Sequence, residues 1–185
     1  MSAPVLLEGS SGPMSWAEFL ALDDSIRGEF FGGCLMVPPA PGKQHQGAVF
    51  ELTVLLKRAV PASLEVVSGW GYRPHNADGG NQSWTPDVTV ATRTDDNAQL
   101  ESVTPELLVE VTSTNYSTDM VTKRLAYAAA GVPNYWVLDR RQDVLRVFAL
   151  RDGAYAETQT VRRGQPEAVT VAGVPVTVDV TKLMS

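Results

Sequence analysis

Apolar residues recur along this chain with two periodicities, that of a helix in some segments and that of a strand in others. Helical spacing of apolar residues predicts three helices, over residues 16–22, 43–59 and 119–130. Gly131 directly follows the third helix, where a glycine commonly ends a helix. Short apolar runs between turn residues predict strands over residues 29–31, 34–37, 64–67, 84–91, 107–112, 134–138, 144–150 and 154–160, with one or two more between 168 and 180.

The order of these elements predicts the fold class. Helices and strands alternate along most of the chain, which indicates an α/β or α+β fold with a mixed central sheet flanked by helices. The last predicted strands would add C-terminal β-hairpins. We expect one domain over residues 15–185, preceded by a flexible segment over residues 1–14 that is rich in small and polar residues.

Two carboxylates stand inside runs that otherwise resemble buried strands. Asp87 lies in the run Thr-Pro-Asp-Val-Thr-Val, and Glu110 lies in the run Leu-Leu-Val-Glu-Val-Thr-Ser. A buried charge costs several kcal/mol unless another group compensates it, and a divalent cation compensates two nearby carboxylates at once. Oxygen ligands of this kind favour Mg²⁺ or Mn²⁺. An ordinary ion pair or a position at a strand edge is the alternative explanation for both acids.

Lys123 follows on the third predicted helix, four residues after Asp119. An ammonium group beside a metal ion could hold a water molecule or a phosphate oxygen. The alternative is an exposed helical pair of Asp119 and Lys123, worth about 0.3–0.5 kcal/mol.

These residues and their surroundings resemble a known family. The resemblance rests on Pro86-Asp87, on Glu110-Val111-Thr112-Ser113, on Asp119, Lys123 and Tyr127, and on the run from Gly131 to Asp139, which reads GVPNYWVLD. Arg27-Gly28-Glu29, Met36, Pro38-Pro39 and His45 fit the same pattern upstream. Together they resemble the Uma2-type (DUF820) restriction endonucleases of the PD-(D/E)XK nuclease superfamily, from about Ser15 to Leu150.

The resemblance implies a restriction-endonuclease-like fold with a four-stranded mixed core sheet. It also implies that Asp87, Glu110 and the backbone carbonyl of Val111 bind Mg²⁺ or Mn²⁺, and that Glu29 is a third acidic residue of the site. Thr112 stands where the superfamily signature has lysine, and Lys123 would replace that lysine from the following helix. The implied activity is metal-dependent endonucleolytic hydrolysis of DNA. An inactive nuclease-fold binding module and a metal-dependent hydrolase of another substrate are the alternatives.

The net charge and the composition limit the class of protein and its cellular location. The net charge of −6 argues against a protein that coats nucleic acids, which would be basic. The single cysteine, Cys34, suits a reducing cytoplasm, and neither a secretory signal nor an apolar run of membrane-spanning length is evident. We expect no membrane association, and a homodimer supported by the apolar hairpin at 144–150 and by exposed strand ends. The family pattern suggests that His45 could approach the site from the start of the second helix, and an ordinary helix-start residue is the alternative that we expect. Arg73 and His75 lie in a loop where a nucleic-acid backbone could pass, and a solvated loop is the alternative that we expect.

Overall fold

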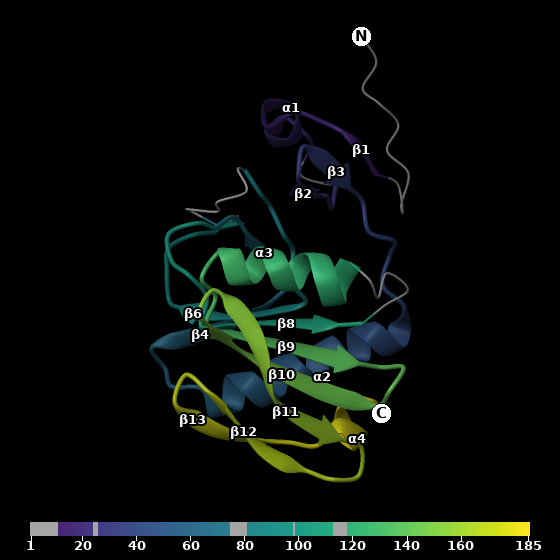
Figure 1. Ribbon diagram of the computed structural model, residues 1–185, viewed down its shortest axis with the longest axis vertical. Coiled ribbons are helices and arrows are strands. Elements are labelled where there is room, and N and C mark those ends of the chain that lie inside the picture. Colours follow the sequence, from purple (N-terminus) through teal and green to yellow (C-terminus); the bar gives the residue numbers. More distant parts are fainter. Residues whose placement is uncertain (1–10, 24–25, 75–80, 98, 113–117) are drawn as a thin grey trace.

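A six-stranded mixed sheet forms the centre of the computed structural model, which describes residues 11–23, 26–74, 81–97, 99–112 and 118–185 (Figure 1). The strand order is β11-β10-β9-β8-β6-β4. These strands span β4 (Leu64–Ser68), β6 (Val88–Thr92), β8 (Leu107–Val111), β9 (Asn134–Asp139), β10 (Val144–Arg151) and β11 (Ala154–Arg162). β8 and β9 pair in parallel, and the other neighbours pair antiparallel. This mixed pairing confirms the predicted fold class.

Each face of the sheet is covered by a helix, because residues alternate between the two faces along every central strand. Helix α2 (Lys43–Ala59) packs Leu52 and Leu56 into the core cluster that contains Val88 and Val109. Helix α3 (Arg124–Ala129) belongs to the opposite cluster, which contains Ala91, Leu108 and Tyr135. Figure 1 shows α3 in front of the sheet and α2 behind it. Residues of the two acid-bearing strands therefore alternate between the two core clusters.

A small N-terminal unit lies at one end of the molecule (Figure 1). It contains β1 (Ser11–Pro13), α1 (Trp16–Leu20), β2 (Glu29–Phe31) and β3 (Cys34–Met36), in a three-stranded sheet of order β1-β3-β2. Ser15 caps α1 in a reciprocal capping box with Glu18. Strand β1 lies within the segment expected to be flexible, and it is ordered there by pairing with β3.

The C-terminal residues complete the core. β12 (Glu167–Val171) and β13 (Val174–Val178) form the predicted hairpin, and α4 (Val180–Leu183) follows it. Val169, Val171, Val176 and Val178 join the same core cluster as α2. None of the helices in the described ranges is long and apolar enough to cross a membrane.

Three expectations about the elements need correction. The central sheet has six strands rather than four, because the hairpin β10–β11 continues the same hydrogen-bonded sheet. The third helix begins as a π-helical segment, η1 (Thr118–Lys123), and becomes α-helical only at Arg124. The short parallel pair β5 (Gly71–Tyr72) and β7 (Gln99–Leu100) lies in regions for which no strand was predicted. The predicted end of the helix is confirmed, since Gly131 has a φ of 76°.

Candidate active site

The segment before β6 joins the N-terminal unit to the central sheet. Ser83 exchanges two backbone hydrogen bonds with Phe30, at 2.8 and 2.9 Å, and Trp84 exchanges two with Tyr72, at 2.7 and 2.9 Å. The next amide, that of Thr85, donates to Glu29 Oε1 at 3.0 Å. Residues 83 and 84 therefore pair with Phe30 and Tyr72 rather than with the central sheet, and β6 begins at Val88 instead of at the predicted residue 84. This pairing also brings the carboxylate of Glu29 from β2 to the end of the central sheet.

Lys123 lies between two buried carboxylates. Its Nζ is 2.9 Å from Glu29 Oε1 and 3.1 and 3.2 Å from the two oxygens of Glu110. Tyr127 donates its hydroxyl proton to Glu110 Oε1 at 2.8 Å. Glu29, Glu110 and Lys123 are only 5%, 2% and 5% exposed, so screening by water is weak and these charge-assisted bonds are strong.

Asp87 is held by a different pair of partners. Its Oδ1 is 2.9 Å from Nε2 of His45 in the first turn of α2, and its Oδ2 accepts the backbone N–H of Val111 at 2.7 Å. The β6–β8 register pairs Val88 with Val109, so its continuation by one residue places Asp87 opposite Glu110. The backbone pairing of β6 with β8 ends at Val88 and Val109, and beyond it the carboxylate of Asp87 accepts the next available N–H of β8, that of Val111.

The carbonyl of Val111 lies on the same side of β8 as its N–H, because both groups of one strand residue point toward the same neighbouring strand. That side is the one on which Asp87 accepts the Val111 amide. The backbone N–H of the next residue, Thr112, points to the opposite side of β8 and donates to the carbonyl of Leu138 in β9 at 2.9 Å. The carbonyl of Val111 and the carboxylate of Asp87 therefore lie on the same side of β8.

The predicted site residues thus form two adjoining groups. Glu29, Glu110 and Lys123 are in direct contact, whereas the contacts of Asp87 are with His45 and Val111. In the described ranges, no three or more His, Cys, Asp or Glu residues are grouped so that they could hold a metal ion. The side chain of Asp119 and all of His75 lie outside the described residues, so the pairing of Asp119 with Lys123 stays a prediction.

Sequence reasoning missed the contacts of two residues at this site. For His45 the expected ordinary helix-start role is wrong, because its ring contacts Asp87, in agreement with the alternative that the family pattern suggested. Tyr127 was named only as part of the family pattern, although its spacing of four from Lys123 places both side chains on one helix face. Arg73 forms an ion pair with Glu101 at 2.9 Å. Trp70, Tyr72 and Trp84 are buried, as expected for core residues.

The environment of Tyr127 keeps its hydroxyl protonated. Burial raises the pKa of Tyr127 well above its ordinary value, and the nearby carboxylates of Glu110 and Glu29 raise the pKa further. Burial also raises the pKa of Tyr72, to about 12. A protonated Tyr127 is a hydrogen-bond donor, which is what the carboxylate of Glu110 requires.

We therefore expect alkaline destabilisation that depends on Tyr127. Above pH 10 the unfolded chain loses the phenolic proton while the folded chain keeps it, so the free energy of unfolding falls by about 1.4 kcal/mol per pH unit for each such tyrosine. Tyr127→Phe should reduce this slope between pH 10 and 11.5 in urea unfolding experiments. It should also cost about 1.5–3 kcal/mol at pH 7, because it removes a bond to a charged group. Glu18→Gln, at an exposed carboxylate, is a control that should leave the alkaline slope unchanged; an unchanged slope in Tyr127→Phe would contradict the prediction.

The mixed sheet carries acidic residues where two central strands adjoin, and the π-helical start of the third helix supplies a lysine, so the fold is of the restriction-endonuclease-like class. The model of the family Uma2, described as "Putative restriction endonuclease", matches residues 16–180. The chain therefore belongs to the Uma2 family, and the resemblance inferred from the sequence motifs is confirmed.

A solved structure shares the fold. It is described as a putative nuclease belonging to DUF820 from Anabaena variabilis, and it superposes with a TM-score of 0.71 at 19% sequence identity. The alignment covers 93% of this chain and 98% of that one. No curated protein matches the sequence. At this level of identity the likeness establishes the fold, and membership in the family supports a nuclease.

Proposed function

We propose that this protein is a metal-dependent endonuclease that hydrolyses phosphodiester bonds of DNA. The observation that carries the proposal is the grouping of Glu110, Lys123 and Glu29 in one buried cluster, beside an Asp87 whose register position is opposite Glu110. Residues far apart in the sequence meet at one end of the sheet. They supply acidic oxygens and an ammonium group, which are the groups that metal-assisted phosphodiester hydrolysis needs.

The chemistry of the oxygen donors fits a hard divalent cation. Asp87, Glu110 and the carbonyl of Val111 would hold Mg²⁺ or Mn²⁺, and Mg²⁺ commonly binds through one or two carboxylates while keeping several waters. A third acidic residue is therefore not required for such a site. When bound, the ion would polarise the phosphate and supply a water of lowered pKa.

The other side chains have supporting roles in this proposal. Lys123 would orient the attacking water or stabilise the charge that develops on the phosphate oxygens. Glu29 would hold the ammonium group of Lys123 in place, since it lies 2.9 Å from that nitrogen. Tyr127 and His45 would fix the orientations of Glu110 and Asp87, with which they form hydrogen bonds of 2.8 and 2.9 Å.

A cleavage assay tests this proposal. Purified protein is incubated with supercoiled plasmid in Mg²⁺, in Mn²⁺ and in EDTA, and nicked and linear products are separated on a gel. Products should appear with either metal and should disappear in EDTA. A folded protein that cuts neither plasmid nor short duplexes in either metal would refute the proposal, and cleavage confined to RNA or to small phosphodiesters would favour a hydrolase of another substrate.

One observation favours a second candidate, a nuclease-fold module without catalytic activity. Lys123 balances the charge of Glu110 and Tyr127 donates to one of its oxygens, so protein groups alone can compensate this buried carboxylate. Titration calorimetry with Mn²⁺ distinguishes the two candidates. Binding that Glu110→Gln abolishes is required for the enzyme, whereas absence of binding to the folded wild-type chain supports the binding module.

We also propose that the protein acts in the cytoplasm as a homodimer, although the surface suggested by the sequence is unsuitable. Val144, Leu145, Val147 and Phe148 of the hairpin are buried in the core of the chain itself. The remaining support is β11, the outer strand of the sheet, whose outward backbone groups could pair with a second copy. Light scattering at micromolar concentration should give twice the chain mass of 20.0 kDa, and a monomer would exclude this assembly.

A further inference from the structure

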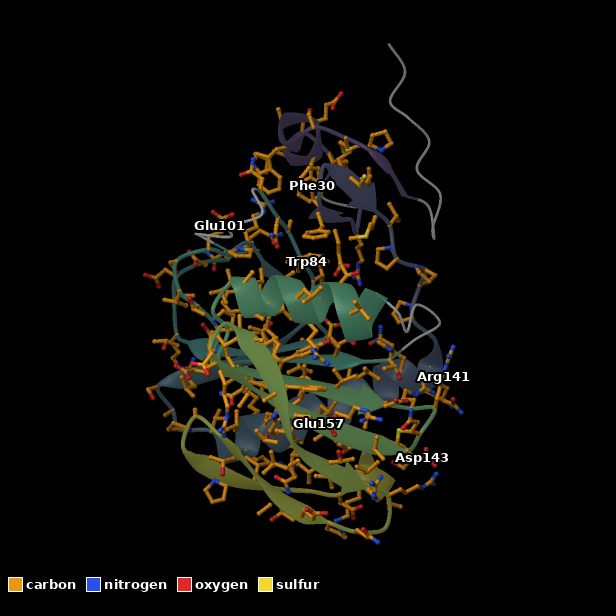
Figure 2. All side chains as sticks on the ribbon, in the orientation of Figure 1. Phe30, Trp84, Glu101, Arg141, Asp143 and Glu157 are labelled. Atoms are coloured by element: carbon orange, nitrogen blue, oxygen red, sulfur yellow. The ribbon has the colours of Figure 1, made fainter. Side chains whose placement is uncertain are left out.

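The turn after β9 lies at the end of the sheet that carries the candidate site. Figure 1 shows that β8 and β9 both point toward this end, and Figure 2 places Arg141 there. The preceding residue, Arg140, donates its backbone N–H to Oγ1 of Thr112 at 2.9 Å. The hydroxyl of Thr112 in turn donates to the carbonyl of Leu138 at 3.3 Å. Thr112, which occupies the signature lysine position, thus attaches the turn to β8 one residue after Val111.

The side chain of Arg140 reaches the other partner of Asp87. Its Nη2 donates to Oε1 of Gln44 at 2.7 Å, and Gln44 directly precedes His45 in the first turn of α2. Both contacts of Arg140 are therefore chain neighbours of the two residues, His45 and Val111, that hold the carboxylate of Asp87. The guanidinium group therefore lies at the first turn of α2, where Gln44 directly precedes His45, and Arg140 is partly exposed to solvent.

Among the described residues, no carboxylate forms an ion pair with Arg140. Arg73, Arg146 and Arg163 each form an ion pair with a glutamate or aspartate. The guanidinium of Arg140, by contrast, has a neutral amide as its partner, and no acidic side chain in the described part of the chain lies within 4.0 Å of it. A guanidinium has five N–H donors in a planar fork that matches a phosphate group, and Gln44 accepts from only one terminal nitrogen. Lys43, next to Gln44, is exposed and adds a second positive charge nearby.

We propose that Arg140 binds a backbone phosphate of the DNA next to the bond that is cut, and that Thr112 and Gln44 hold the arginine in position. The inference rests on the proposed function and names the contact that would position the substrate. It also assigns a task to Thr112, because its hydroxyl fixes the turn that carries the arginine. An acidic protein that binds a polyanion needs such local positive charge at the site.

The test measures binding separately from cleavage. Fluorescence anisotropy of a labelled duplex is recorded in Ca²⁺ over a series of salt concentrations, and a gel verifies that the duplex stays intact. Arg140→Gln should weaken binding about tenfold and make the slope of log K against log salt shallower by about 0.9, the value for one phosphate contact. Arg140→Lys should keep the slope but lose part of the affinity, because an ammonium group lacks the planar fork.

Two further variants separate positioning from charge. Thr112→Val should lower the affinity, Thr112→Ser should restore it, and Thr112→Val should add nothing when Arg140 is already glutamine. Arg151→Gln is the matched control, because Arg151 is exposed at the opposite end of β10, roughly 20 Å or more along the sheet, and should leave both affinity and slope unchanged.

The outcomes distinguish the two proposals. Wild-type protein that binds and cuts the duplex, together with an Arg140→Gln variant of unchanged affinity and slope, would overturn the role of Arg140 alone. A folded wild-type protein that neither binds nor cuts DNA would overturn both proposals. Thermal unfolding of each variant shows whether it is folded.

Discussion

Asp87→Asn is expected to reduce cleavage of plasmid DNA by about a thousandfold, which corresponds to roughly 4 kcal/mol of transition-state stabilisation. Asparagine has the same shape as aspartate and keeps one oxygen that accepts the Val111 amide, so the end of the sheet should stay intact. The change removes a negative charge that the divalent cation needs. The initial rate of plasmid nicking in Mg²⁺ measures the effect, and thermal unfolding verifies the fold.

The control for this variant is Asp95→Asn, which changes an exposed carboxylate in the loop between β6 and β7. It should cleave at the wild-type rate, so that any loss in Asp87→Asn belongs to the site rather than to net charge. Cleavage at equal rates by wild type and Asp87→Asn would identify a contaminating nuclease as the source of the activity. In that case the assignment of Asp87 would be wrong.

Lys123→Met is expected to have the largest effect on stability. Methionine has a similar length but no charge, so the buried carboxylates of Glu29 and Glu110 lose the ammonium group that lies between them. Removing one partner of a buried ion pair typically costs about 3–5 kcal/mol. For a chain of this size each kcal/mol lowers Tm by about 2–4 °C, so Tm should fall by roughly 6–20 °C. Urea unfolding and calorimetry measure the loss, and DNA cleavage should disappear with it.

Lys182→Met, which changes an exposed lysine in α4, is the matched control and should alter the free energy of unfolding by less than about 0.5 kcal/mol. Combining Lys123→Met with Glu29→Gln should cost less than the sum of the two single changes, because the double variant leaves one buried carboxylate fewer without its partner. Strict additivity, or a loss below about 1 kcal/mol in Lys123→Met alone, would show that the cluster is not a tightly coupled ion pair.

The candidate site was only partly predictable from the sequence. Asp87 and Glu110 were recognisable because a charge within an apolar strand is rare and costly. The contact between Glu29 and Lys123 was not visible as a pattern, since the two residues are far apart and meet only because Ser83 pairs with Phe30 in the N-terminal sheet. His45 was undervalued for the same reason, because nothing in the sequence of α2 shows that its first turn faces Asp87.

The sequence by itself determined the elements whose signals are local: the apolar periodicity of α2, the capping box at Ser15, the glycine that ends α3, and the alternation of β8 between two buried faces. Family membership also followed from short motifs in their order along the chain. Only the tertiary structure decided that the hairpin β10–β11 extends the central sheet, that Lys123 lies between two carboxylates, and that the hydroxyl of Thr112 accepts the backbone N–H of Arg140. These features depend on hydrogen bonds and ion pairs between residues far apart in the chain, and such contacts leave no periodic trace in the sequence.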